Sequence, residues 1–350
     1  MQDLSVNDFN KNNISSSNTL SNVLAVAENV ENSDVDETIQ AEEKEVEELS
    51  TELIERKAIV FAILIPFSII GVLIRIGLIN LHSYPGTPVF SLIYPQFVGC
   101  VIMGLTTGFC GSITTFSSWI LLIFNEYTSQ HIPHRSVAYN VLASLADIGI
   151  TIGMSVTGLK FGEHLADIII PRHQIRLGKL YKIVQKPSKL NEFTIADILC
   201  LGFGIVSFIL VVALASTVQV HRNIIFATVF APIGTSIRCY LSKYNTLKKH
   251  FPLGTFAANL SGSIVLGILF LLSNGIVSSQ LSCEIIEGLA NGFCGCLTTI
   301  SSFANEITRL PRKHAYKYAL VSVLMGQVAM ILTIGIYHWT IGLSSTSTCN

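Results

Sequence analysis

The chain has 350 residues, of which 50% are apolar and 13% are charged, whereas about 25% are charged in an ordinary soluble domain. Of its 23 acidic residues, 14 lie before Arg56, which leaves too few to cover a soluble surface. The net charge is −1 and the basic residues form short clusters between apolar stretches, unlike the basic face of a nucleic-acid-binding protein. The composition therefore predicts a membrane protein.

Residues 1–55 form an acidic segment that is rich in Asn, Ser and Glu. Such a segment is too polar to bury a core, so we expect a disordered cytosolic tail. It lacks the basic start and the apolar stretch of a signal peptide.

Nine apolar spans follow this tail, each near the roughly 20 residues that cross a hydrocarbon layer of about 30 Å. We therefore predict an all-α membrane protein with nine crossings. The spans lie at residues 57–81, 89–105, 106–124, 135–159, 194–219, 223–242, 252–274, 284–308 and 315–342.

Lys and Arg in the short loops indicate which side of the membrane each loop occupies. Segment 160–189 carries seven of them, and segments 243–249 and 309–313 carry three each. By contrast, the outer segments 82–88, 275–283 and 342–350 carry none, and Arg222 is the one outer exception near a helix end. This pattern predicts a cytosolic N-terminus and an extracellular C-terminus.

Most cysteines lie inside the apolar spans. We interpret six of them as small buried hydrophobic residues rather than as a disulfide framework. The cysteines show no metal-ligand spacing, and no Ser/His/Asp or Cys/His grouping suggests a nucleophile, so we do not expect an enzyme. The six are Cys100, Cys110, Cys200, Cys239, Cys294 and Cys296.

An internal repeat organises the spans, and it decides the fold class. Five positions recur with the same offset of 163 residues: Gly71, Arg75, Gln96, Gly99 and Gly104 match Gly234, Arg238, Asn259, Gly262 and Gly267.

Two further blocks recur in the same order. A Gly-Phe-Cys-Gly-Xaa-Xaa-Thr-Thr-Xaa-Ser-Ser segment begins at Gly108 and again at Gly292, with an offset of 184. Ser144 and Ser322 are then paired at an offset of 178. Each half is therefore predicted to be a four-helix unit.

The number of spans then predicts how the two units are oriented. Four crossings return the chain to its starting side, so an additional span between the units inverts the second one, an architecture that places a site near the midplane. We assign residues 56–160 to the first repeat, 161–220 to a basic cytosolic loop and inverting linker helix, 221–343 to the second repeat, and 344–350 to a short tail.

The segments Gly111–Ser118 and Gly295–Ser302 are the most specific signals. A Gly, a Thr-Thr pair and a Ser-Ser pair make poor continuous helix, and a helix break in lipid requires partners for its freed carbonyls. Two breaks that meet at the centre would form a cage of carbonyl oxygens for a cation. The alternative is a Gly and Ser face for close helix packing.

Neutral hydrogen-bond donors and aromatic rings lie near these breaks. Donors and the positive edges of rings describe a path for a small anion. A buried Asn that joins helices is the alternative for Asn259, and snorkelling is the alternative to a vestibule charge for Arg75 and Arg238. The path would be formed by Asn259, Thr298, Thr299, Ser301 and Ser302, with Phe116, Trp119 and Phe303 beside it.

At these residues the chain resembles the fluoride channel family, specifically the eukaryotic fluoride export proteins that fuse two four-helix units through an extra helix. The resemblance runs from about Arg56 to the end of the last span. It implies a passive, fluoride-selective channel with two potential pores at an antiparallel interface, so that one chain in the lipid bilayer is equivalent to a dimer. It also implies a structural sodium ion, bound by the backbone carbonyls of Gly111, Thr114, Gly295 and Thr298.

The resemblance further implies unequal pores. Phe116 with Phe303 forms a complete aromatic pair, whereas Trp119 with Ile300 does not. The second half also has Asn259 and Tyr318 where the first has Gln96 and Asn140. We therefore expect one active pore, with Thr299, Ser301, Ser302, Arg75 and Arg238 along it, and one vestigial pore at Trp119, Ile300, Gln96 and Asn140.

The first half is also 21 residues shorter between its second helix and its Gly-Phe-Cys-Gly block. Either a segment is missing or its second and third helices form a very short hairpin. If residues 89–124 cross only once, the tail would lie outside.

The leading hypothesis is a plasma-membrane channel that exports fluoride and protects the cell. One alternative is an inverted-repeat transporter of a small cation or solute that uses Asp147, an acid deep in its span. Another is a structural membrane protein whose Gly and Ser faces mediate assembly.

Overall fold

The computed structural model describes residues 59–84, 89–105, 110–128, 136–169, 195–275, 279–340, 342 and 349. The chain separates into two units, Met1–Ala58 and Ile59–Asn350, and all described residues belong to the second. The predicted tail and most of the basic loop lie outside the described residues. Every regular element among the described residues is helical, in agreement with the predicted fold class.

Six helices are long and apolar enough to cross a membrane, and they coincide with six of the nine predicted spans. Most of each helix's surface remains uncovered by protein, as expected for helices that face lipid. They are the helix Ile59–His82, α5 (Val137–Ile169), α7 (Ile195–Thr217), α8 (Arg222–Ser242), α9 (Leu253–Gly275), and α13 (Arg312–Met330), which continues through η4 (Ile331–Gly335) into α14 (Ile336–Thr340).

The other three predicted spans are short or broken. The third span of the second half consists of α10 (Gln280–Gly288), the π-helical η3 (Leu289–Cys294), α11 (Gly295–Leu297) and α12 (Ile300–Arg309). In the first half, the second predicted span is the short helix α3 (Ile93–Leu105). The third consists of η1 (Cys110–Ser112) and α4 (Ser117–Tyr127).

The prediction of nine full-length crossings is therefore wrong for residues 89–105 and 106–124. At 1.5 Å per residue the 13 residues of α3 extend about 20 Å, which is less than the hydrocarbon layer. The 21-residue offset between the two halves corresponds to the end of α9, the following connection and α10. Among its described residues, the first half therefore lacks these parts of both helices.

Two glycines allow the short helix α3 to pack closely against α5. A Cβ atom on Gly162 would lie 2.1 Å from the carbonyl oxygen of Val101, and one on Gly104 would lie 2.3 Å from that of Leu159. Small residues at such positions allow the close backbone contact on which helix association in lipid depends.

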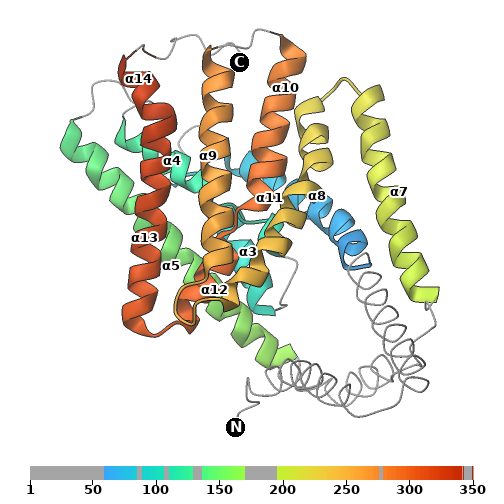
Figure 1. Cartoon of the computed structure of the whole chain (residues 1–350), viewed down its shortest axis with the longest axis horizontal. Coiled ribbons are helices and arrows are strands. Elements are labelled where there is room, and N and C mark those ends of the chain that lie inside the picture. Colours follow the sequence, from blue (N-terminus) through green and yellow to red (C-terminus); the bar gives the residue numbers. More distant parts are fainter. Residues whose placement is uncertain are drawn as a thin grey trace, which may run out of the picture. The chain divides into compact units, whose positions relative to one another are not determined.

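The two halves share one core. The largest cluster of buried apolar residues joins Phe116, Trp119 and Ile120 of the first half to Phe303 and Tyr318 of the second. Figure 1 shows α9 beside α13, with the linker helix α7 beside α8. A Cβ atom on Gly204 of α7 would lie 2.3 Å from the carbonyl oxygen of Ala62, so α7 packs closely against the first helix.

One disulfide joins Cys283, near the start of α10, to Cys349, with a Cα–Cα distance of 5.3 Å. The six cysteines that we predicted to be unbridged are free thiols. The Cys283–Cys349 pair, which lies outside the apolar spans, was not predicted from the sequence.

Candidate functional site

The two breaks predicted in the Gly-to-Ser segments lie against each other in the core. Between α11 and α12, Thr298 and Thr299 are extended, with φ and ψ of −94° and 153° and of −152° and 130°. Extended residues cannot continue the helical hydrogen-bond ladder, so the carbonyls before the break and the N–H groups after it need other partners. Thr114 and Thr115 interrupt the first half in the same way, between η1 and α4.

Each break is capped by a threonine from the other half. The N–H groups of Ile300 and Ser301 donate to Thr114 Oγ1 at 3.2 and 3.1 Å. Reciprocally, the N–H groups of Phe116 and Ser117 donate to Thr298 Oγ1, both at 3.1 Å. Side-chain oxygens at helix N-termini are typical caps, but here each crosses to the opposite half. Neither break is therefore complete without the other.

The remaining hydroxyl groups form one buried cluster around these caps. Thr115 Oγ1 lies 3.1 Å from Thr298 Oγ1, and Thr299 Oγ1 lies 3.2 Å from both Thr114 Oγ1 and Ser301 Oγ. All five side chains are at most 1% exposed. The structure thus brings together the predicted residues Thr299 and Ser301. Ser302 is less buried, and its N–H donates to Thr299 Oγ1 at 3.3 Å.

The paired amide residues secure the breaks from the second helix of each half. Asn259 accepts from the Thr299 N–H at 2.8 Å and donates to the Thr299 carbonyl at 3.3 Å. Gln96 forms the same two bonds with Thr115, at 3.3 and 2.6 Å. We expected Asn259 and Gln96 to distinguish an active from a vestigial half, but the two amides have the same partners. The difference therefore does not arise at this position.

Arg75 is almost fully buried, with 1% exposed, between the halves. Its guanidinium donates to the carbonyls of Ser112 at 2.9 Å, of Gly295 at 2.8 Å, and of Asn291. The first two are carbonyls freed by the breaks, and the third lies in the π-helical turn η3. Snorkelling is therefore wrong for Arg75, because its guanidinium lies inside the core, where hydrogen bonds to backbone carbonyls stabilise its charge.

The two glycines before the breaks make room for arginines. A Cβ atom on Gly295 would lie 2.3 Å from Arg75 Nη2, and one on Gly111 would lie 1.2 Å from Arg238 Nη1. Each arginine thus reaches the glycine of the opposite half. Arg238 is only partly buried, so the two arginines are placed equivalently but enclosed unequally.

The residues expected to bind sodium can be tested for chemical fit. The breaks free backbone carbonyls near Gly111, Thr114, Gly295 and Thr298, and carbonyls of unwound helices are suitable neutral ligands for this ion. The Gly295 carbonyl accepts from Arg75 and retains a second lone pair. The set of donors therefore fits a sodium ion.

A line of aromatic rings passes through the site. The ring centroids are 5.4 Å apart between Trp119 and Phe116, 5.4 Å between Phe116 and Phe303, and 5.3 Å between Phe303 and Tyr318. The first two pairs meet edge to face, so the positive edge of one ring lies against the negative face of its neighbour. Ile300 is buried in the same core, where it adds no ring.

Glu306 belongs to the site, although its place after Asn305 near the end of a predicted span suggests a solvated acid. Its carboxylate accepts from the Thr255 hydroxyl at 2.5 Å, the Tyr318 hydroxyl at 2.6 Å and the Asn245 amide at 3.3 Å. The offset of 184 places Leu122 at the equivalent position of the first half, which was the signal available from the sequence. The Tyr318 equivalent, Asn140, is buried in α5.

Asp147 lies in α5 and is partly buried. Its backbone carbonyl accepts from Trp119 Nε1 at 3.4 Å. Among the described residues, no group of three or more His, Cys, Asp or Glu could bind a metal ion.

Comparison with known proteins gave concordant matches. Residues 225–336 match the family described as "CrcB-like protein, Camphor Resistance (CrcB)". Fluoride export protein 1 of Candida albicans is 31% identical over 315 residues, covering 78% of each chain. Fluoride export protein 1 of Schizosaccharomyces pombe is 31% identical, covering 78% of this chain and 94% of that protein.

A bacterial relative matches a smaller part of the chain. Fluoride-specific ion channel FluC 1 of Streptococcus pneumoniae is 36% identical over 113 residues, covering 32% of this chain and 96% of that protein. No solved structure matched the chain.

Proposed function

The chain belongs to the family of fluoride export proteins, and we propose that it is a passive fluoride channel whose working pore follows the line Phe116, Phe303 and Tyr318. The protein is a multi-pass membrane protein and not an enzyme. The observation that carries the proposal is the pair of mutually capped helix breaks, flanked by aromatic edges and neutral hydroxyls.

This arrangement suits the passage of a small anion. Hydroxyl donors and ring edges can replace part of the ion's hydration without a fixed charge that would trap it. The Arg75 guanidinium donates its hydrogen bonds to backbone carbonyls. An inside-negative potential drives an anion outward with about 2.3 kcal/mol per 100 mV, so export needs no other energy source.

We expect only one of the two potential pores to conduct. The second half contributes Phe303, Tyr318 and Glu306 to one side of the site, with Phe116 from the first half. The equivalents on the other side include Ile300, Asn140 and Leu122, which lack the ring, hydroxyl and carboxylate.

The halves are proposed to be inverted repeats, so that one chain is equivalent to an antiparallel dimer. Figure 1 supports this, because α5 and its equivalent α13 run in opposite directions. The reciprocal threonine caps are those expected from such a relation. The short hairpin removes part of an outgoing and a returning helix together, so it leaves the direction of the following helices unchanged.

We place the N-terminus in the cytosol and the C-terminus outside the cell, in the plasma membrane. The distribution of Lys and Arg supports this orientation. The Cys283–Cys349 disulfide also supports it, because disulfides persist on the oxidising side of a membrane.

A sodium ion bound by the carbonyls of Gly111, Thr114, Gly295 and Thr298 is part of the proposal. When bound, it would coordinate carbonyl oxygens that the breaks leave without helical partners. Arg75 donates hydrogen bonds to such carbonyls as well. The test is thermal unfolding of the purified protein in sodium, potassium or N-methylglucamine chloride. A midpoint that is higher only in sodium supports the site, and equal midpoints contradict it.

The function is tested by fluoride efflux from liposomes that contain the full chain, with the potential set by potassium and valinomycin and with chloride as the control anion. We expect rapid fluoride-selective efflux that Phe303→Ile abolishes. The matched control is Ile300→Val in the other pore, which should leave efflux unchanged. Equal effects of the two variants would contradict the assignment of the pore.

Two other functions remain as outcomes of the same assay. Loss of a proton-coupled or cation-coupled flux in Asp147→Asn would favour a secondary transporter. No effect of either Thr298→Val or Phe303→Ile on any flux would favour a purely structural protein.

A further inference from the structure

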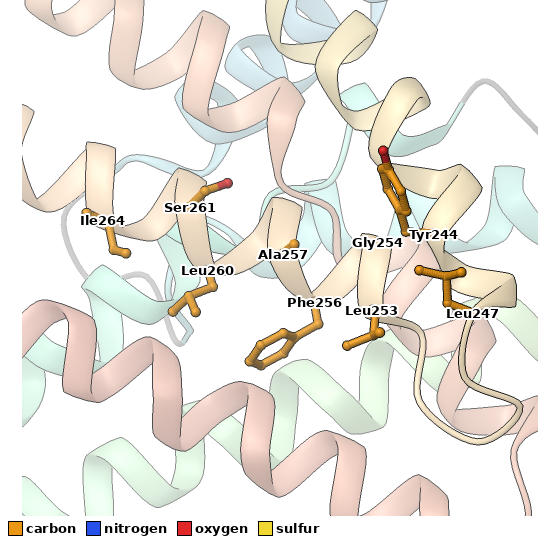
Figure 2. Close-up of a pocket in the computed structure, with 9 residues that line it drawn as sticks. All are labelled: Tyr244, Leu247, Leu253, Gly254, Phe256, Ala257, Leu260, Ser261 and Ile264. Atoms are coloured by element: carbon orange, nitrogen blue, oxygen red, sulfur yellow. The ribbon is translucent and has the colours of Figure 1, made fainter.

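An apolar groove runs along α9 (Figure 2). It has a volume of about 490 Å³. Figure 2 shows the lining side chains in a row from the connection between α8 and α9 to Ile264. They are Tyr244, Leu247, Leu253, Gly254, Phe256, Ala257, Leu260, Ser261 and Ile264.

The length and depth of the groove fit one lipid chain. From Leu253 to Ile264 the helix rises about 16 Å, which is about half of a 30 Å hydrocarbon layer and therefore about one leaflet. The small residues Ala257 and Ser261 are exposed and leave space between the larger lining side chains. The groove thus has the dimensions of a single acyl chain that lies along α9.

One end of the groove is strongly basic. Lys243, Lys248 and Lys249 are exposed and adjoin the lining residues Tyr244 and Leu247 in sequence. The Lys243 ammonium lies 5.0 Å from the centroid of the Tyr240 ring, whose hydroxyl is 3.3 Å from that of Tyr244. The sequence contains no Asp or Glu between 198 and 283. An acid that does bond to this connection is Glu306 of α12, which accepts from the Asn245 amide and the Thr255 hydroxyl.

We propose that this groove binds an anionic phospholipid, with one acyl chain along α9 and the headgroup at Lys243, Lys248 and Lys249. An apolar channel that ends at three cations matches an amphiphile with an anionic head. Lysines at the membrane surface attract such headgroups. Asn259 lies on the opposite side of the same helix, where it bonds Thr299. A bound lipid would therefore brace the helix that secures one of the two breaks.

The test is native mass spectrometry of the purified full chain, titrated separately with phosphatidylserine and phosphatidylcholine. We expect a one-to-one phosphatidylserine adduct that survives collisional activation at which the phosphatidylcholine adduct dissociates. Lys248→Gln with Lys249→Gln should weaken the phosphatidylserine adduct by about 30-fold, at roughly fivefold for each lysine. The matched control is Lys160→Gln with Arg222→Gln, which removes the same charge from α5 and from the opposite end of α8 and should leave binding unchanged.

Three results would overturn the proposal. Equal retention of the two lipids would show no headgroup selectivity, and equal losses in the two double variants would show diffuse attraction instead of a site. A phosphatidylserine adduct that forms only after the acids of residues 42–55 are changed to amides would assign the surface to the acidic tail. Ala257→Phe with Ser261→Phe fills the groove and should abolish the adduct, and the lysine variants keep the proposal testable if that variant fails to fold.

The binding result does not depend on the proposed function. A second measurement, fluoride efflux in liposomes with and without phosphatidylserine, rests on it. Adduct formation with lipid-independent efflux would support the site but contradict the bracing of α9. Failure of all efflux would concern the proposed function alone.

Discussion

Gly295→Ala tests the packing of Arg75 most directly. The new Cβ atom would lie 2.3 Å from Arg75 Nη2 and 2.6 Å from its Cζ, so the guanidinium must move. Arg75 would then lose at least two of its three bonds, which join it to the carbonyls of Ser112, Gly295 and Asn291. At about 1.5–3 kcal/mol for each hydrogen bond to a charged group, the expected destabilisation is about 3–6 kcal/mol.

The expected loss of stability in Gly295→Ala is opposite in sign to the change that helix propensity predicts. Gly295 has ordinary helical φ and ψ, so propensity alone predicts that Ala stabilises α11 by about 1 kcal/mol. Gly111→Ala is the matched control. It displaces Arg238, which is partly exposed and can therefore move toward the surface at smaller cost.

The assay is thermal unfolding of the purified protein, with fluoride efflux measured in parallel. A double-mutant cycle isolates the contact: in the Arg75→Ala background, Gly295→Ala should add little further destabilisation. The reasoning is refuted if Gly295→Ala raises the unfolding temperature, or if its cost is undiminished when Arg75 is absent.

Three further predictions concern the same core. Thr298→Val removes the shared acceptor of two N–H groups of α4, so it should destabilise by about 1–2 kcal/mol and stop efflux, whereas Thr298→Ser should retain both, as measured by unfolding and efflux. Tyr318→Phe leaves Glu306 without its 2.6 Å donor. It should slow efflux and lower the free energy of unfolding by about 1.5–3 kcal/mol. The control is Tyr316→Phe, at an exposed position on the same helix, which should match the parent chain in both assays. Gly162→Leu would separate α3 from α5 and should give aggregated protein on size-exclusion chromatography. A monodisperse peak would contradict this. The control is Gly153→Leu, which has open space at its Cβ and should elute normally.

The amino-acid sequence by itself determined the class of the protein and the order of its parts. Apolar length and charge are local properties of a segment, so the membrane spans could be located without knowing their neighbours. Some of the repeat pairs also have matching neighbours in the structure. Gly99 and Gly262 leave room for the methyl groups of Thr114 and Thr298, although 15 residues separate the first pair and 36 the second.

Only the tertiary structure decided how those parts complete one another. The sequence identified Thr114 and Thr298 as helix breakers, but it could not show that each hydroxyl caps the opposite half. It likewise placed Glu306 at a helix end without revealing its three donors. Such contacts join residues far apart in the chain, and no local pattern encodes the partner. Lipid cannot hydrogen-bond the backbone groups freed by a break, so these distant partners, rather than the local sequence, determine where a broken helix is stable.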